Sequence, residues 1–197
     1  MAYGPQKDYG VMLNGVLVGH VDTTGDFEKD KEIVMDLIKQ KGLYVQPSEV
    51  KTMFRQALSF ATTASYLHRK DLCRSPWNVH SVAPFVVNSA LGIELYLKAL
   101  AKANGKTLRG HNLLNLFDTL PSPARKTVET VLPVSLQQWK PKDESDLRAC
   151  VAGLADAFVE WRYLHEKNRT STIHIDRIIF VLHVFHEACR ATPAIST

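Results

Sequence analysis

Two residues with a spacing suited to phosphate chemistry, Arg169 and His174, stand with four residues between them. We expect Thr172 to cap a helix that follows, with His174 in its first turn, where the helix dipole favours a neutral imidazole that can accept a proton. The pair could cleave RNA, the histidine taking the 2′-hydroxyl proton and the arginine stabilising the pentavalent phosphate. An ordinary loop is the alternative, because 24 Lys and Arg and 8 His residues produce such spacings by chance.

Another arginine, Arg162, continues the apolar stripe of a helix that the periodicity predicts over 144–167. A guanidinium on such a face needs a carboxylate, because a buried unpaired charge is strongly destabilising. We expect Arg162 to contact Glu94, and Glu166 is a further candidate. Lys98 lies one turn after Glu94 and can pair with the same carboxylate. The pattern fits either a stabilising ion pair between helices or a polar cluster that binds a ligand.

The cluster His183, His186 and Cys189 does not predict a metal site. These residues lie three apart on one predicted helix, so their side chains drift around it, and no CxxC motif supports them. The GxSxG nucleophile motif, the GxxxxGK[ST] phosphate loop and the GxGxxG motif are all absent. We therefore expect no metal and no cofactor.

The charge of the chain is unevenly distributed. The net charge is +4, yet the stretch from Leu95 to Phe117 has no acidic residue. Its basic residues are Lys98, Lys102, Lys106 and Arg109. Such a stretch predicts weak, salt-sensitive binding of RNA or a nucleotide, and the alternative is a solvated helix face.

The elements that must position these residues are mostly helical. Asn14-Gly15 between two short apolar runs predicts a β-hairpin, and a helix follows over 26–41, so residues 1–45 form a small N-terminal extension. Residues 46–197 predict an all-α antiparallel bundle with four long helices and some short ones. The expected helices are 48–67, 84–104, 111–120, 122–132, 144–167 and 173–190, with loops at 71–81 and 133–143.

Composition excludes several classes of protein. A hydrophobic fraction of 45% and a charged fraction of 22% are typical of a soluble globular chain. Three cysteines without CxxC spacing indicate a reducing compartment. The longest uninterrupted apolar run, Ile178–Leu182, is far shorter than the ~20 residues of a membrane span. We expect a cytoplasmic protein that does not bind membranes.

Three short segments resemble, in the expected order, elements of HEPN-like (higher eukaryotes and prokaryotes nucleotide-binding) helical domains. The run ELYLKAL from Glu94 is similar to the "ElxlKal" helix of that family, and GHNLLNLF from Gly110 to its "GHxLxxLf" turn. The run FVEWRYLHE from Phe158 is similar to its "FxxWRYxxE" element. The resemblance covers about residues 48–190.

The resemblance implies an antiparallel bundle, often a homodimer, that occurs in prokaryotic defence and toxin–antitoxin systems. Many members are metal-independent endoribonucleases with an Arg and a His four to six residues apart at the start of the last long helix. Arg169 and His174 match that spacing and are the expected catalytic residues. Thr170 departs from the pattern, because catalytic members usually carry Asn, Asp or His directly after the arginine.

The alternative that the resemblance implies is a non-catalytic module. The Trp161-Arg-Tyr163 form is similar to branches in which such residues shape a pocket for a nucleotide or RNA. Such a module would bind a nucleotide, RNA or a protein partner. Its candidate ligand-binding residues are Arg162, Glu94, Lys98, His111, Tyr163 and Glu166.

Overall fold

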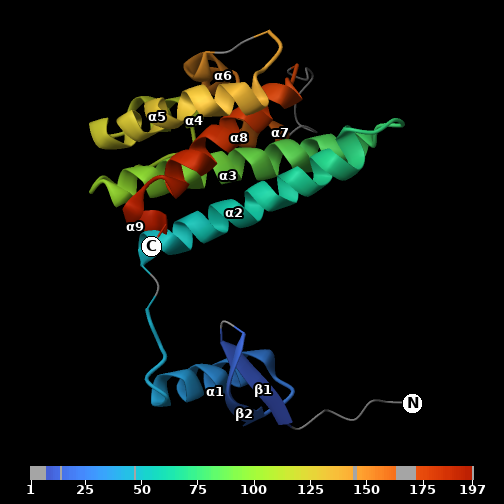
Figure 1. Ribbon diagram of the computed structural model, residues 1–197. Helices are drawn as coiled ribbons and strands as arrows, with labels where there is room; N and C mark the ends of the chain where they lie inside the picture. Colours follow the sequence, from blue (N-terminus) through green and yellow to red (C-terminus); the bar gives the residue numbers. More distant parts are fainter. Residues whose placement is uncertain (1–7, 14, 47, 144–145, 163–171, 197) are drawn as a thin grey trace. The chain divides into compact units, whose positions relative to one another are not determined.

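The chain divides into two compact units, residues 1–47 and 48–197 (Figure 1). The computed structural model describes residues 8–13, 15–46, 48–143, 146–162 and 172–196, with the backbone alone at 159 and 162. The protein is mostly helical and has an antiparallel two-stranded hairpin in its first unit. The prediction of a mostly helical bundle that is preceded in the sequence by a small hairpin is therefore confirmed.

The first unit is a hairpin followed by a helix. Strands β1 (Asp8–Leu13) and β2 (Val16–Asp22) pair antiparallel, with an irregularity between Val11 and Met12. Gly15 has φ +81°, a conformation that favours glycine in the tight turn. Helix α1 (Phe27–Gln40) contains no buried residue. Among the described residues of this unit, Val11 is the one hydrophobic residue that is buried.

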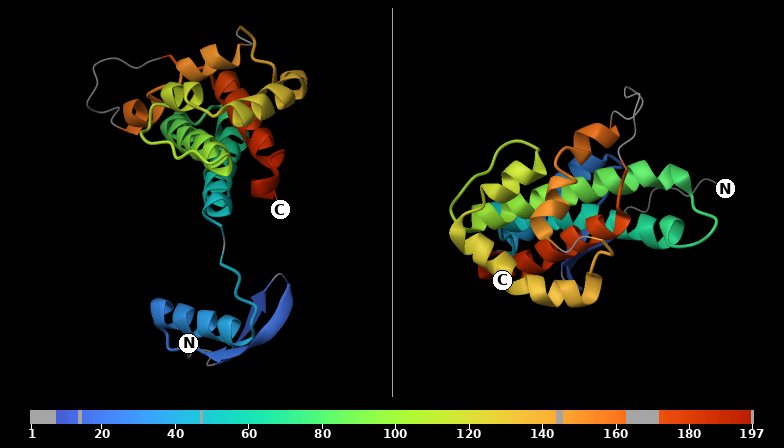
Figure 2. Two further views of the ribbon diagram at one scale, coloured as in Figure 1. Left: turned by 90° about the vertical axis from the view of Figure 1, so that its left-hand side faces the viewer. Right: turned by 90° about the horizontal axis from the view of Figure 1, so that it is seen from above.

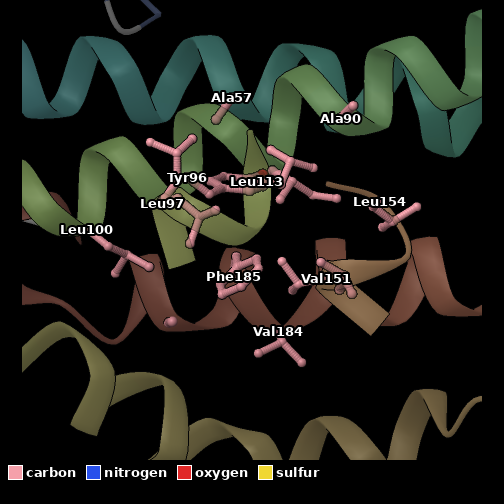
Figure 3. Packing of buried hydrophobic residues seen from close by; sticks show 14 of the residues in the cluster. Ala57, Ala90, Tyr96, Leu97, Leu100, Leu113, Val151, Leu154, Val184 and Phe185 are labelled. Carbon is pink, nitrogen blue, oxygen red and sulfur yellow. The ribbon is translucent and has the colours of Figure 1, made fainter. Parts of the chain in front are cut away.

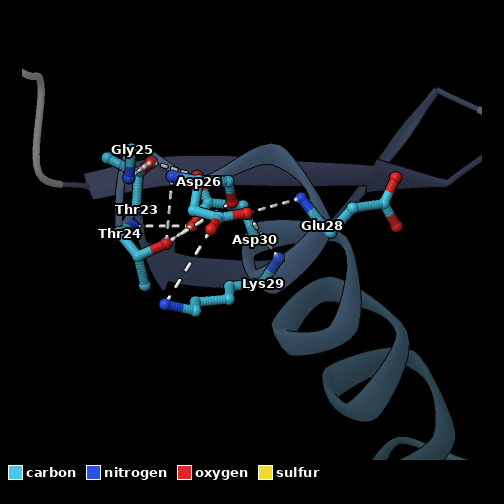
Figure 4. A network of polar contacts seen from close by, with 7 residues as sticks. All are labelled: Thr23, Thr24, Gly25, Asp26, Glu28, Lys29 and Asp30. Carbon is cyan, nitrogen blue, oxygen red and sulfur yellow. Dashed lines mark hydrogen bonds and ion pairs between the residues drawn. The ribbon is translucent and has the colours of Figure 1, made fainter.

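A network of short polar contacts fixes the start of α1 (Figure 4). The Asp26 carboxylate caps the helix by accepting hydrogen bonds from the backbone N–H groups of Glu28 at 3.0 Å and Lys29 at 3.3 Å. Asp30 accepts bonds from the hydroxyl of Thr23 and from the N–H of Thr24 at 2.6 Å. These bonds lower the pKa of Asp30 below its ordinary value.

The second unit is built around helix α3 (Val82–Ala103), which packs against α2 (Glu49–Leu67) on one side and α8 (Ile175–Arg190) on another (Figure 3). Its apolar residues face both neighbours, so the helix is buried on most sides, as predicted. The largest fully buried side chains on α3 are Phe85, Val86, Ile93, Tyr96, Leu97 and Leu100.

Small residues bring α2 and α3 close together. A Cβ atom on Gly92 would lie 3.4 Å from the backbone nitrogen of Ala61 and 3.5 Å from the carbonyl oxygen of Ala57. Ala57 and Ala64 on the facing side of α2 are fully buried. The side chain of Leu182 on α8 also approaches this point, at 3.3 Å, so Gly92 lies where three helices meet.

The predicted helices 48–67, 84–104 and 173–190 are confirmed as α2, α3 and α8 within two residues. Shorter elements connect them. They are the π-helical turn His68–Leu72, the 3-10 turn Val79–Ser81, α4 (Leu113–Asp118) and the C-terminal α9 (Pro193–Ser196). The two turns lie in or beside the stretch 71–81 that we predicted to be a loop.

Helix α5 (Ser122–Trp139) corrects the prediction that a helix ends at 132 and a loop follows over 133–143. The helix continues through Pro133, although an interior proline costs about 3 kcal/mol. Leu132 and Leu136, on either side of the proline, pack against the core, and α5 lies beside α8 (Figure 2). Burial of these residues offsets the lost backbone hydrogen bond.

The single helix predicted over 144–167 is also wrong. The structure has α6 (Leu147–Ala152), a break, and α7 (Ala157–Arg162). The break is held by another part of the chain, because the N–H of Leu113 donates to the carbonyl of Ala155 at 2.9 Å. This bond anchors the turn between the two helices to the segment that leads into α4.

One helical stretch in the described part of the chain, Val79–Ala103, is long and apolar enough to cross a membrane by length and composition alone. Its most apolar part is 56% buried inside the protein. The central helix of a bundle meets the same criterion, and α3 is such a helix.

Candidate functional site

The predicted catalytic histidine lies at the start of α8. His174 is exposed and is itself the N-cap residue (φ −104°, ψ 99°), with no capping hydrogen bond from its side chain. The prediction that Thr172 caps the helix and that His174 lies in its first turn is therefore wrong. Arg169, its predicted partner, lies outside the described residues.

The carboxylate of Asp176 occupies the beginning of α8 instead. It accepts a hydrogen bond from the backbone N–H of Lys142 at 2.9 Å. Burial alone would raise the pKa of Asp176, but this bond and one from the N–H of Arg177 bring the pKa below its ordinary value. A negative charge thus complements the positive end of the helix dipole and ties α8 to the segment after α5.

His174 lines a cavity of about 600 Å³, the His174 cavity. Two tryptophans line it as well: Trp77, which is 63% exposed, and Trp139, which is 46% exposed at the end of α5. Lys140 and Lys142 line it together with two acidic residues, Asp143 and Asp176, and neither lysine forms an ion pair with any of the described residues. Exposed indole rings can stack on bases and ammonium groups can bind phosphates, which are the contacts that proteins use to bind single-stranded nucleic acids.

A second polar cluster lies around Glu94, which is only 5% exposed on the inner side of α3. Its carboxylate accepts hydrogen bonds from the Nζ atom of Lys98 at 2.7 Å and contacts the Nδ1 atom of His111 at 3.0 Å. The predicted Glu94–Lys98 pair is confirmed. The His111 ring also lies 6.1 Å from that of Phe158 on α7, and its side chain is 63% exposed.

The turn that carries His111 is anchored by its neighbour Asn112. The side chain of Asn112 caps α4 by accepting a bond from the N–H of Asn115 at 2.9 Å, and its amide donates to Asp156 at 3.0 Å. The turn is thereby fixed between α3 and the break before α7. Glu94, Lys98 and His111 are the predicted ligand-binding residues that the structure brings together.

The remaining predicted ligand-binding residues cannot be placed in this cluster. Tyr163 and Glu166 lie outside the described residues, and for Arg162 the structure describes the backbone alone. The predicted contact between Arg162 and Glu94 therefore also lies outside what is described.

The basic stretch 95–117 is largely engaged within the protein. Lys98 binds Glu94, and the Nζ atom of Lys102 lies 2.9 Å from the carboxylate of Glu49. The Nζ atom of Lys106 donates to the carbonyl of Thr119 at 2.6 Å. Three of its four cationic side chains thus already have partners, so the stretch is less available to phosphates than its composition indicates.

No group of three or more His, Cys, Asp or Glu side chains among the described residues is placed to hold a metal ion. Cys189 is buried, and burial raises the pKa of its thiol. Its sulfur approaches the carbonyl of Tyr96 at 3.5 Å, which fits a packed core thiol better than a metal ligand.

Sequence reasoning missed Trp77, Trp139 and the two lysines of the His174 cavity. A signal was present in the run Trp139-Lys140-Pro141-Lys142, where an aromatic residue stands beside two basic ones. The prediction of a loop over 133–143 concealed the meaning of this run, because Trp139 reaches the cavity as the last residue of the full-length α5.

Comparison with protein-family models, with curated proteins and with solved structures found no match to this chain.

Proposed function

We propose that residues 48–197 form a HEPN-like domain that cleaves RNA without a metal ion, with His174 as general acid–base and Arg169 as the residue that stabilises the phosphate. The observation that carries this proposal is the His174 cavity. An exposed histidine lines it together with two exposed tryptophans and two lysines that pair with none of the described acids. These are the groups that a ribonuclease of single strands needs.

The chemistry is an internal transesterification. The 2′-oxygen of the ribose attacks the adjacent phosphorus while the imidazole of His174 takes its proton. The bond from phosphorus to the 5′-oxygen breaks, and that oxygen receives the proton back from the imidazolium. The products are a 2′,3′-cyclic phosphate and a 5′-hydroxyl. Arg169 would stabilise the extra negative charge that the phosphate carries in the transition state.

We extend the proposal to the setting that the resemblance implies. The domain would act as a homodimer in the cytoplasm, in a prokaryotic defence or toxin–antitoxin system and with a cognate protein partner. A dimeric site predicts that the specific activity rises with protein concentration until the dimer is saturated.

The experiment is cleavage of a single-stranded oligoribonucleotide in EDTA by the wild type, Arg169→Ala and His174→Ala. The Arg74→Ala variant is a matched control, because Arg74 is an exposed arginine outside the His174 cavity. The proposal predicts cleavage by the wild type and the control and strong loss in the other two. A substrate with a single 2′-deoxynucleotide should resist cleavage at that position. Equal cleavage by all four proteins would contradict the proposed site.

The cluster around Glu94 favours a second candidate function, a non-catalytic module that binds a nucleotide, RNA or a protein. Lys98 and the exposed imidazole of His111 both contact the buried carboxylate of Glu94. A ligand that binds His111 would therefore change the hydrogen bonding of a buried residue of α3. Arg162, Tyr163 and Glu166 would be its further ligand residues. This candidate predicts RNA binding without cleavage, weakened by His111→Ala and unaffected by His174→Ala.

A further inference from the structure

A second cavity, of about 360 Å³, follows the groove between α2 and α8, here the α2–α8 groove, and shares His68, Trp139 and Ile179 with the His174 cavity. Each helix contributes side chains at positions i, i+3, i+4 and i+7, so the groove runs along both helices for roughly 10 Å. From α2 these are Leu58, Ala61, Thr62 and Ser65, and from α8 they are Ile179, Leu182, His183 and His186. The volume lies in the usual range of small-molecule sites, about 300–1,000 Å³.

One end of the groove presents a hydrogen-bond donor. The hydroxyl of Tyr96, a fully buried residue of α3, lies 3.0 Å from the Nδ1 atom of His186. Burial lowers the pKa of His186 and raises that of Tyr96, so the imidazole is neutral and the phenol keeps its proton near pH 7. The buried hydroxyl is satisfied when it donates to Nδ1, which leaves the hydrogen of the ring on Nε2.

The Nε2 hydrogen of His186 has no close acceptor in the described part of the chain. The nearest carboxylate oxygen, on Glu187, is 3.9 Å away, beyond hydrogen-bond distance. An acceptor atom of a ligand in the groove would satisfy it.

The other end of the groove presents a positive charge. Arg69 lies in the π-helical turn that follows α2, and its Nε atom makes a long hydrogen bond of 3.4 Å to the carbonyl of Ser65. Its two terminal nitrogen atoms bind no acceptor of the described residues, and they form the fork that matches a carboxylate. Among the described residues no acidic side chain lines the groove, and Arg69 is the one that brings a formal charge to it near pH 7.

The body of the groove is aromatic and uncharged. Phe85 and Trp139 line it, and the Trp139 ring lies 6.2 Å from that of His183. Burial lowers the pKa of His183 and of His68, so both imidazoles are neutral rings near pH 7. Such walls favour a flat aromatic ligand.

We propose that the α2–α8 groove binds an elongated aromatic monocarboxylate, with its carboxylate on Arg69, its rings along the aromatic walls and a hydrogen-bond acceptor at the Nε2 atom of His186. The proposal does not depend on RNA cleavage. It rests on the three features that the groove aligns: one cation, aromatic walls and an unused donor at the far end.

The test uses the full chain and 6-hydroxy-2-naphthoate, a rigid two-ring acid with a hydroxyl oxygen at the end opposite the carboxylate. Binding is measured by isothermal titration calorimetry and by saturation-transfer NMR. We expect 2-naphthol, which lacks the carboxylate, to bind about 10- to 100-fold more weakly, because it loses a charged hydrogen bond to Arg69. Arg69→Gln should weaken the acid by a similar factor and leave 2-naphthol unchanged.

Two further variants distinguish the groove from a general affinity for aromatic acids. Arg74→Gln removes a nearby exposed arginine outside the groove and should leave binding unchanged, whereas His186→Phe should weaken the acid about 3- to 10-fold. Circular dichroism melts show whether each variant is folded. Equal binding of the acid and 2-naphthol, equal effects of the two arginine variants, or no binding of either compound would each overturn the proposal.

Discussion

The Oε1 atom of Glu94 lies 3.0 Å from the Nδ1 atom of His111, which joins the inner side of α3 to the turn before α4. The same oxygen lies 2.7 Å from the Nζ atom of Lys98. The segments ELYLKAL and GHNLLNLF, two of the three that resemble HEPN-like domains, thus meet at one buried carboxylate. A buried charge without such partners would be strongly destabilising.

Replacement of Lys98 by methionine should lower the free energy of unfolding by about 3 kcal/mol, because among the described residues it leaves the Glu94 carboxylate with His111 alone as a partner. Lys102→Met is the matched control on the same helix. Its partner Glu49 is exposed, so the loss should stay below about 1 kcal/mol. Urea unfolding followed by circular dichroism measures both, and equal losses would show that the Glu94 cluster is not a buried ion-pair site.

His186 should make the stability of the protein fall in mild acid. Burial lowers the pKa of His186 below the ordinary value of 6.5. The negative charge of Glu187 raises this pKa, and the positive charge of Arg190 lowers it further. The stability that neutral His186 contributes is present above pH 6.5 and is lost as the pH falls through its lower folded-state pKa, because the unfolded chain binds the proton first. Urea midpoints between pH 7.5 and about 5 should therefore fall less steeply in His186→Gln than in the wild type. His80→Gln, at an exposed site, should keep the wild-type slope.

The helices α2, α3 and α8 were predictable from the spacing of their apolar residues, whereas the same spacing over 144–167 wrongly predicted one continuous helix. The apolar stripes of α2 and α8 both contribute to the hydrophobic core, so local periodicity and tertiary packing agree in these helices. The hairpin was predictable from its turn residues, because Gly15 takes the positive φ that the turn requires.

The elements that were missed depend on contacts between distant parts of the chain. At the break between α6 and α7 the carbonyl of Ala155 accepts a hydrogen bond from the N–H of Leu113, and no local pattern encodes a partner that far away. Pro133 locally predicts a helix end, but the core contacts of Leu136 outweigh it. The place of Trp139 in the candidate site follows from that same extension of α5, so it could not be predicted once the helix was ended at 132.

Trp139→Ala should weaken the binding of a single-stranded oligoribonucleotide about 5- to 150-fold, because stacking of one base on an aromatic ring contributes roughly 1–3 kcal/mol. The measurement is fluorescence anisotropy with the His174→Ala protein as background, so that the RNA stays intact. Tyr66→Ala, which removes an exposed aromatic ring outside the His174 cavity, should bind like the background protein. Similar effects of the two changes would exclude Trp139 as a base-stacking residue.

Lys140→Gln and Lys142→Gln should each reduce the slope of log K against log salt for RNA by about 0.7, the value for one phosphate contact on a single strand. Lys126→Gln, an exposed lysine on α5 outside the cavity, should leave the slope unchanged. An unchanged slope in all three variants would place the phosphate contacts elsewhere on the protein.

The most direct test of the central claim is the initial rate at which His174→Ala cleaves a single-stranded oligoribonucleotide in EDTA, compared with the wild type and with His80→Ala. A general acid–base contributes roughly 10²- to 10⁴-fold, so we predict a loss of at least about 100-fold for His174→Ala. The His80→Ala protein should cleave at the wild-type rate, with 2′,3′-cyclic phosphate ends in the products. Undiminished cleavage by His174→Ala, or no cleavage by the wild type at any protein concentration, would contradict the assignment of His174 as the catalytic residue of a ribonuclease.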